Sequence, residues 1–186
     1  MKLYTVDNSY IEKLYDADSE VFYEPSGYDI KPYVGIIVQN DTYNYFVPLT
    51  SAKEKHRKWS NVTKTNYIIY ELLPKDNFNF PSDWICVETQ NNIKHILSVL
   101  EIKKMIPVPM QYVHEINFSK MTDLSYRALL EKEIKFIKPI WRTIQNKANV
   151  IYSNQKETGV VREFHCDYTK LEQIYNRENT SNLITV

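Results

Sequence analysis

The sequence predicts an α+β protein in which an antiparallel sheet or barrel forms first along the chain and long helices then pack against it. Short runs of alternating or β-branched residues, separated by turn signals, fill the first half of the chain. After Asp123 the spacing of apolar residues changes to the helical period. The chain has 186 residues and is 43% hydrophobic. This is enough to bury a core, so we expect residues 1–186 to form a single domain.

The first elements are predicted to be a strand and a short helix. Residues 2–6 alternate as a strand does. Ser9 and Glu12 have the spacing of a capping box, which predicts a helix that begins at Ser9 and ends near Asp18. The inward side of this helix is expected to carry Ile11, Leu14 and Tyr15.

A hairpin is predicted next. Residues 25–27 (Pro-Ser-Gly) indicate a turn, and residues 33–38 are rich in β-branched side chains. Asn40 and Asp41 form a second turn signal, so residues 43–49 are expected to pair back as the partner strand. Later strands are expected at residues 67–73 and, with less regular patterns, at 84–88 and 93–99.

A long kinked helix is predicted from Asp123 to about Ser153, with Thr122 or Asp123 as its N-cap. Pro139 lies inside it and should kink it, because the proline ring opposes the carbonyl of the preceding turn. Residues 155–159 are expected to be a loop, and 167–179 a last helix. The apolar face of the long helix repeats at alternating steps of four and three, through Leu130, Ile134, Ile137, Trp141, Ile144, Ala148 and Ile151. The last helix is expected to turn Leu171, Ile174 and Tyr175 inward.

Composition excludes several classes of protein. Lysine plus arginine and aspartate plus glutamate both number 23, so bulk charge alone cannot hold nucleic acid. Three glycines are too few for a glycine-rich phosphate loop. The two cysteines, Cys86 and Cys166, form no CxxC pair, and the four histidines lack metal-ligand spacing. We therefore expect no metal and no cofactor.

The N-terminus begins in strand-like alternation and lacks the long apolar run of a signal peptide. The apolar runs are of strand length, which is too short for a membrane span. We therefore expect a soluble, cytoplasmic protein with no membrane partner.

The most informative segment is residues 50–59. Thr50 and Ser51 place two hydroxyls where a buried strand stops. Basic and aromatic side chains that suit phosphate binding and base stacking follow them. A solvated basic loop with ordinary turn-forming hydroxyls is the alternative. Tyr28 and Lys31 precede the hairpin and could face the same rim. The basic and aromatic residues of the segment are Lys53, Lys55, His56, Arg57, Lys58 and Trp59.

In order along the chain, these residues resemble the ToxN/AbiQ toxin family. The specific stretches are Lys-Pro-Tyr-Val-Gly-Ile at 31–36 and Pro-Leu-Thr-Ser at 48–51. Further similar segments lie at residues 2–6, 105–108, 148–152 and 166–172, so most of the chain is covered. Residues 74–100 match poorly, and Ala52 stands where the family often has proline.

The resemblance implies a type III toxin: an endoribonuclease inhibited by a structured RNA antitoxin in a system that aborts phage infection. It implies a compact, SH3-like antiparallel barrel related to the MazF/Kid toxins, with helices added. It also implies metal-independent, sequence-specific cleavage of mRNA and of the toxin's own repeat antitoxin transcript, which leaves 2′,3′-cyclic phosphate and 5′-hydroxyl ends. The expected partners are that repeat-derived RNA and mRNA, in a closed protein–RNA hetero-oligomer, with no DNA.

Roles follow from the chemistry of such cleavage. Lys31 and Lys53 can supply positive charge to the crowded phosphate, and Thr50 and Ser51 can donate hydrogen bonds or orient the 2′-hydroxyl. His56 is a candidate acid or base. The remaining candidates are RNA-binding residues, through base stacking or phosphate contacts. They are Tyr10, Tyr28, Lys55, Arg57, Lys58, Trp59 and Lys135.

Two other functions fit the same residues. A non-catalytic RNA-binding barrel would use the same basic loop and aromatic side chains. An RNase toxin with a protein antitoxin would cleave RNA in the same way but would be inhibited by a protein instead of an RNA. RNA cleavage in EDTA by the protein with and without Ser51 tests the first alternative. A tandem nucleotide repeat upstream of the gene would favour the RNA antitoxin over the second.

Overall fold

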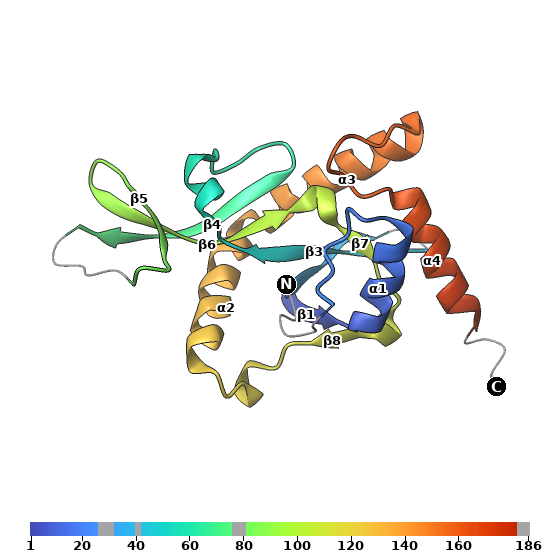
Figure 1. Ribbon diagram of the computed structural model, residues 1–186, viewed down its shortest axis with the longest axis horizontal. Helices are drawn as coiled ribbons and strands as arrows, with labels where there is room; N and C mark the ends of the chain where they lie inside the picture. Colours follow the sequence, from blue (N-terminus) through green and yellow to red (C-terminus); the bar gives the residue numbers. More distant parts are fainter. Residues whose placement is uncertain (26–31, 40–41, 76–80, 182–186) are drawn as a thin grey trace.

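A twisted antiparallel sheet forms the centre of the molecule (Figure 1). The structure is a computed structural model that describes residues 1–25, 32–39, 42–75 and 81–181. The main path of the sheet runs β4-β6-β3-β2-β1-β8, β5 pairs with β6, and β7 pairs with β3. The strands are β1 (Lys2–Val6), β2 (Tyr33–Gln39), β3 (Asn44–Ser51), β4 (Asn66–Pro74), β5 (Ile85–Glu88), β6 (Asn92–Glu101), β7 (Ile106–Pro107) and β8 (Val113–Glu115).

Among the described residues the sheet is open, so the expected SH3-like barrel is not confirmed. β4 and β8 stand at the two ends of the strand order, and no pairing joins them among the described residues. The strands also differ in length: β4 and β6 have 9 and 10 residues, whereas β1 and β8 have 5 and 3. The long β4–β6 ladder extends past the rest of the sheet, where β5 joins it (Figure 1). The expected relation to the MazF/Kid toxins stays a prediction.

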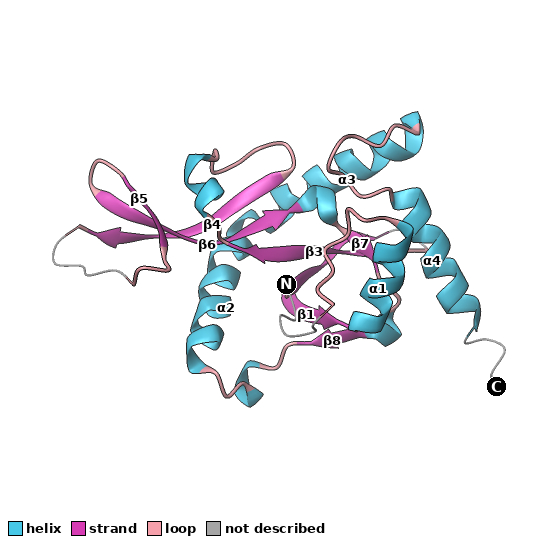
Figure 2. Cartoon of the chain, in the orientation of Figure 1, coloured by secondary structure: helices cyan, strands magenta, loops and turns pink. Residues whose placement is uncertain are grey.

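Four α-helices flank the sheet (Figure 2). α1 and α4 pack on each other at one end of the molecule, where α4 also contacts β7. α2 lies against β4 and β6, and α3 contacts β2. The helices are α1 (Asn8–Ala17), α2 (Leu124–Ile137), α3 (Trp141–Thr158) and α4 (Tyr168–Ser181).

The N-terminal strand and the β2–β3 hairpin are confirmed, although the turn signals at residues 26–27 and 40–41 lie outside the described residues. The capping box is wrong, because α1 already begins at Asn8 and its N-cap is Asp7. The helix buries Tyr10, Ile11 and Leu14. Tyr15, expected to be inward, is 38% exposed.

The helical second half also follows the pattern. The Asp123 carboxylate caps α2 by accepting the Tyr126 N–H at 2.9 Å. At Pro139 the helix breaks into a 3₁₀ turn (Lys138–Ile140), which confirms the kink. α3 continues past the expected end to Thr158, where Gly159 has a φ of 67° and stops it. Buried residues of the predicted apolar face are Leu130, Ile137, Ile144 and Ala148.

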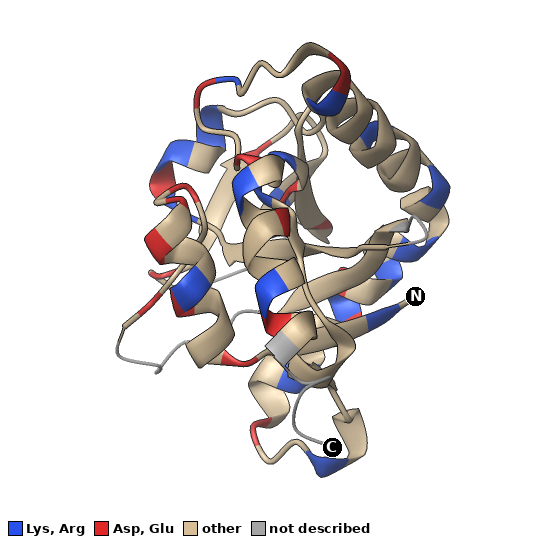
Figure 3. Cartoon of the chain, turned by 90° about the vertical axis from the view of Figure 1, so that its right-hand side faces the viewer, with Lys and Arg blue, Asp and Glu red and all other residues tan. Residues whose placement is uncertain are grey.

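The main apolar core draws residues from α1, the sheet and all three later helices. On the side of the molecule shown in Figure 3, positive and negative residues are interspersed, in keeping with the zero net charge. Among the residues described, no helix is long and apolar enough to cross a membrane. Because the net charge is zero, binding of a charged ligand must rely on local clusters of side chains.

Gly35 provides a test of core packing. A Cβ atom at this position would lie 2.1 Å from Cδ1 of the Phe46 ring, which is fully buried. Gly35→Ala is therefore expected to lower the free energy of unfolding by about 1–3 kcal/mol, the usual range for overpacking. Urea unfolding measures the change. Adding Phe46→Leu should restore part of the loss, because it removes the ring. An unchanged midpoint in the single variant would contradict this packing.

Candidate functional site

The two hydroxyls predicted at the end of β3 have different environments. Thr50 is 7% exposed, and its hydroxyl donates to the Val99 carbonyl at 3.3 Å. Ser51 is the last residue of β3 and is exposed, while its partner across the ladder is Ser98 of β6. Neighbouring residues of a strand point to opposite faces. Thr50 therefore fixes the strand end, whereas Ser51 is presented to solvent.

Ser51 opens onto a cavity of about 580 Å³, which we call the Ser51 groove. Its walls are the end of β3, the middle of β6, the segment that leads into β5, and the first turns of α2. The volume lies within the usual range for sites that bind small ligands. Residues that line it include Ser51, Ala52, Asp83, Trp84, His95, Ser125, Tyr126, Leu129 and Lys132.

The basic loop that follows Ser51 is held in shape by His56. This side chain is 2% exposed, and its Nδ1 accepts the Lys53 N–H at 2.9 Å. Burial, followed by the charges of Lys55 and Lys53, lowers the pKa of His56, so the ring is neutral at pH 7. The expected roles of His56 in RNA contact and proton transfer do not fit this buried position. Its hydrogen bond to the Lys53 N–H stabilises the start of the short 3₁₀ helix Glu54–Lys58.

The cations of this loop are not equivalent. Arg57 makes two hydrogen bonds to the Glu54 carboxylate, at 2.6 and 3.0 Å, and a third to the Cys86 carbonyl. Its charge is thus balanced within the protein. Arg57 links the loop to β5 and is not expected to bind a phosphate. Lys53 and Lys58 are exposed. These two lysines remain candidates for contact with a phosphate.

The aromatic residue of the loop has a packing role. Trp59 is half-buried and packs against the small apolar cluster of Ile68, Ile96 and Val99. The Lys55 ammonium lies 5.5 Å from the centre of its ring, a cation–π contact. Base stacking on Trp59 would have to displace Lys55 from that face.

The other predicted RNA-binding residues are spread over the molecule. Tyr10 is fully buried, stacks on Tyr112 at 4.7 Å and donates to the Pro107 carbonyl, so it offers no ring face to a base. Lys135 is exposed on α2. Tyr28 and Lys31 lie outside the described residues.

A polar cluster in the groove has no counterpart among the sequence predictions. Glu71 of β4 faces His95 of β6 across the ladder, and the Glu71 carboxylate meets His95 Nδ1 at 2.9 Å. Lys132 of α2 donates to the same carboxylate at 2.8 Å. Burial alone would raise the pKa of Glu71, but the hydrogen bonds from Lys132 and His95 bring it below its usual value. The His95 ring also stacks on Trp84 at 3.8 Å.

This cluster was missed because its members come from three separate segments. None of them has a local spacing that signals a site. The cross-strand pair of Glu71 and His95 becomes visible only when β4 and β6 are placed in register. The groove thus combines an exposed hydroxyl, an imidazole held by a carboxylate, and two lysines, Lys53 beside it and Lys132 within it. Such a set can bind a phosphodiester and move protons.

A buried acid, Glu133 of α2, directly follows the groove residue Lys132 in the chain. It is 2% exposed, and Oε2 of its carboxyl has no hydrogen-bond partner among the described residues. Burial raises the pKa of Glu133 to about 7, which the hydroxyl of Ser98 opposes only in part. The folded protein therefore holds a proton on Glu133 at a pH where the unfolded chain has released it.

Glu133 gives a pH-dependent stability. A carboxyl with a raised pKa in the fold contributes stability that is present below its unfolded pKa and is lost as pH rises through the folded value. The free energy of unfolding should thus fall between about pH 4.3 and pH 7, by at most about 4 kcal/mol. Glu133→Gln should remove this slope, because glutamine mimics the protonated acid. Denaturant unfolding across this range, with exposed Glu131→Gln as the matched control, checks it. Equal slopes in both variants would contradict the burial of Glu133.

Within the part of the chain that is described, no group of three His, Cys, Asp or Glu side chains is arranged to hold a metal ion.

Comparison with known proteins gives consistent matches. A family described as toxin ToxN of the type III toxin–antitoxin system matches residues 2–176. The chain is 28% identical to the endoribonuclease ToxN of Bacillus thuringiensis subsp. kurstaki, over 92% of this chain and 81% of that protein. It is 25% identical to the endoribonuclease AbiQ of Lactococcus lactis subsp. lactis, over 97% and 92%.

Solved structures agree in fold. One match, with a TM-score of 0.71 and 25% identity, covers 96% of this chain and 97% of the other. That structure concerns a bacterial type III toxin–antitoxin system in which a non-coding RNA pseudoknot selectively inhibits the toxin.

Proposed function

The chain belongs to the ToxN family of type III toxin–antitoxin toxins, and on this premise we propose that it is an endoribonuclease that cuts RNA in the Ser51 groove. The choice of site rests on one observation: the hydroxyl of Ser51 is exposed at the end of a buried strand, beside a basic loop and a groove of nucleotide size. The family match supports the activity, and the geometry of the groove supports the proposed place of cleavage.

We propose cleavage by internal attack of the RNA on its own phosphodiester. The 2′-oxygen attacks phosphorus and gives up its proton to a base, while the bond to the 5′-oxygen breaks and that oxygen takes up a proton. The products are a 2′,3′-cyclic phosphate and a 5′-hydroxyl, so neither water nor metal enters this step. The protein must stabilise the charge that gathers on the phosphate oxygens.

Ser51 and Lys53 are proposed as the residues that touch the reacting phosphate. The Ser51 hydroxyl donates a hydrogen bond to a non-bridging oxygen, and Lys53 adds positive charge. Thr50 supports Ser51 from within the sheet, because its own hydroxyl is committed to Val99. Lys31 directly precedes Pro32, whose carbonyl accepts the Leu49 N–H at 2.9 Å, next to the end of β3. Its proposed role, charge on the phosphate, rests on that sequence position.

His95 is proposed as a proton-transfer residue of the groove. Its Nδ1 is held by the Glu71 carboxylate, and this leaves the other ring nitrogen as the one that can exchange a proton with RNA. The stack on Trp84 fixes the plane of the ring. His95 is only 8% exposed, but unlike His56 it lines the Ser51 groove, so we propose it for the proton-transfer role expected of His56.

The proposed inhibitor is a structured RNA derived from a repeat transcript, as for the family. An RNA that occupies the Ser51 groove blocks the entry of mRNA by competition. We propose that several toxin and RNA copies bridge each other into a closed hetero-oligomer and that the protein acts in the cytoplasm, where mRNA is present. Charge at Lys53, Lys58 and Lys135 would guide the strand along the groove and α2.

The test is end analysis of cleaved RNA. The purified chain is incubated with synthetic single-stranded RNA in EDTA and, separately, in Mg²⁺. We expect equal rates, cyclic-phosphate and 5′-hydroxyl ends, and no cut in an RNA with deoxyribose at the cut position, because the 2′-hydroxyl is the nucleophile. Loss of cleavage in EDTA, or cleavage of the deoxy substrate, would contradict the proposed mechanism. Binding without any cleavage would favour the non-catalytic alternative.

A further inference from the structure

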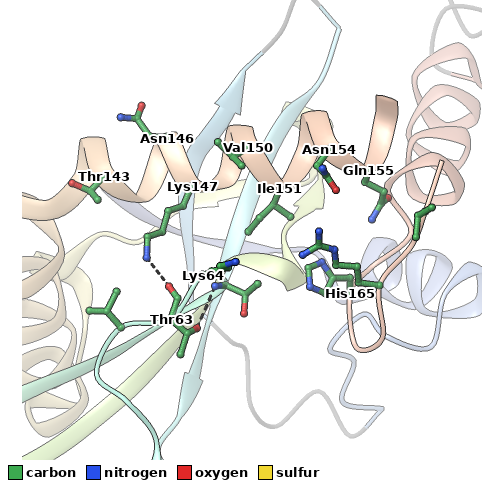
Figure 4. Close-up of a pocket in the computed structure, with 14 residues that line it drawn as sticks. Thr63, Lys64, Thr143, Asn146, Lys147, Val150, Ile151, Asn154, Gln155 and His165 are labelled. Carbon is green, nitrogen blue, oxygen red and sulfur yellow. Dashed lines mark hydrogen bonds between the residues drawn. The ribbon is translucent and has the colours of Figure 1, made fainter. Parts of the chain in front are cut away.

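A second cavity lies away from the Ser51 groove, between α3 and two loops (Figure 4). Its volume is about 780 Å³, and we call it the α3 cleft. One loop, residues 62–65, leads into β4, and the other, residues 160–165, follows α3. We propose that the α3 cleft binds one unpaired nucleotide of an RNA strand, with its phosphate on Lys64 and Arg162 and its base against the valines of the rim.

Charge is the first reason for this inference. Lys64, Lys147 and Arg162 line the cleft, and no aspartate or glutamate of the described residues does so. The whole chain has no net charge, so three cations without an anion mark a local site. Lys64 and Arg162 are exposed and can each contact a phosphate. An anionic ligand is therefore the one that this cleft favours.

Lys147 has a different task. Its ammonium donates to the Thr63 carbonyl at 2.5 Å and lies 4.6 Å from the centre of the Tyr67 ring (Figure 4 shows the hydrogen bond). Burial lowers the pKa of Lys147. This side chain fixes the loop of residues 62–65 against α3, so that the floor of the cleft is formed before a ligand arrives.

The opposite wall is also held in place. The Gln155 amide donates to the Cys166 carbonyl at 3.0 Å and accepts the Tyr168 N–H at 2.7 Å, which folds the chain after α3 back onto the helix. His165 is 9% exposed at the base of the cleft. Burial, followed by the charges of Lys103 and Arg162, lowers the pKa of His165 to about 4. Its ring is neutral at pH 7 and can hydrogen-bond a base without adding charge.

Apolar side chains at the rim point to a base rather than to a bare anion. Val62, Val150 and Val160 line the cleft and are 51%, 70% and 60% exposed. Exposed apolar side chains gathered at a cavity mark a binding surface. The amide of Asn154, which also lines the cleft, offers a donor and an acceptor to a base edge. An apolar wall, an amide and cations together suit a nucleotide of single-stranded nucleic acid.

The inference rests on the proposed function for its choice of RNA, and its test avoids cleavage. A fluorescent single-stranded oligoribonucleotide is titrated with protein in the Ser51→Ala background, and anisotropy is followed over a series of salt concentrations. Arg162→Ala should lower the slope of log affinity against log salt by about 0.7, the value for one phosphate contact on a single strand. Lys2→Ala, an exposed lysine at β1, is the matched control and should keep the slope.

A second pair of variants adds charge without changing volume. Asn154→Asp places a carboxylate in the cleft, whereas Asn149→Asp places one on the same helix outside its lining. The first should weaken RNA binding and the second should not. Thermal unfolding checks that all four proteins fold. If Arg162→Ala and Asn154→Asp both bind as their controls do, the α3 cleft is not an RNA site.

The second part of the test is competition by free nucleotides. If the cleft serves an RNA strand, AMP and UMP at millimolar concentration should displace little of the oligoribonucleotide. Strong displacement that Asn154→Asp abolishes would make a free nucleotide the ligand and would overturn the assignment to an RNA strand. Cleavage by the parent protein is measured separately. A parent that cuts no RNA would refute the proposed function, while a cleft-dependent salt slope would still support this site.

Discussion

Replacing Ser51 with alanine is expected to slow RNA cleavage by about 10²- to 10³-fold, the usual cost of one hydrogen-bond donor to a transition-state oxygen. Ser51 is exposed at the end of β3. Its hydroxyl therefore contributes little to the core, and thermal unfolding should be unchanged. Single-turnover cleavage of a synthetic RNA measures the rate. The same change should abolish toxicity when the protein is induced in bacteria.

The matched control is Ser153→Ala, an exposed serine on α3 outside the Ser51 groove. It should cleave RNA at the rate of the parent and be equally toxic to cells. If the Ser51→Ala protein is folded and as toxic as the parent, Ser51 does not contact the reacting phosphate. The proposed place of cleavage would then have to be abandoned.

Replacing Lys53 with alanine is expected to give the second-largest effect, a fall in single-turnover rate of about 10²-fold or more, because a positive charge aimed at the phosphate acts most strongly in the transition state. The dissociation constant for RNA should change much less than the rate. Lys31→Ala should behave in the same way. Rates and dissociation constants are measured on the same RNA over a salt series.

Lys58→Ala separates catalysis from binding. Lys58 is an exposed lysine of the same loop, and we expect it to contact a phosphate away from the cut. Its loss should lower the salt slope by about 0.7 and leave the rate at saturation near that of the parent. If Lys53→Ala and Lys58→Ala lose affinity and rate in equal proportion, the catalytic assignment of Lys53 is wrong.

Most of the fold follows from local pattern. The β-branched run before residue 40 and its partner predict the β2–β3 hairpin, and the apolar face from Leu130 to Ile151 predicts α2 and α3 with a break at Pro139. Closure of the sheet could not be predicted in this way. It depends on which strands distant in sequence pair, and β4 and β8 are not paired among the described residues.

The candidate site was predictable only in part. Sequence order places Ser51 at a strand end and Lys53 just after it, and the structure keeps both exposed. Composition does not reveal which side chains of a basic loop already have partners within the protein. Arg57 is bound by Glu54 and His56 by the Lys53 amide, so neither is free for RNA in the way expected. The His95 and Glu71 pair arises from strand register, which no local motif records.

The measurement that tests the central claim most directly is a lysine footprint of the RNA complex. The protein is bound to a substrate RNA with deoxyribose at the cut position, and acetylation of each lysine is compared with that in the free protein by mass spectrometry. If RNA lies in the Ser51 groove, Lys53 and Lys132 lose reactivity, as does Lys31, while Lys2 and Lys170 on other elements keep theirs. Unchanged reactivity of both Lys53 and Lys132 in the saturated complex would mean that RNA binds elsewhere and that the Ser51 groove is not the place of cleavage.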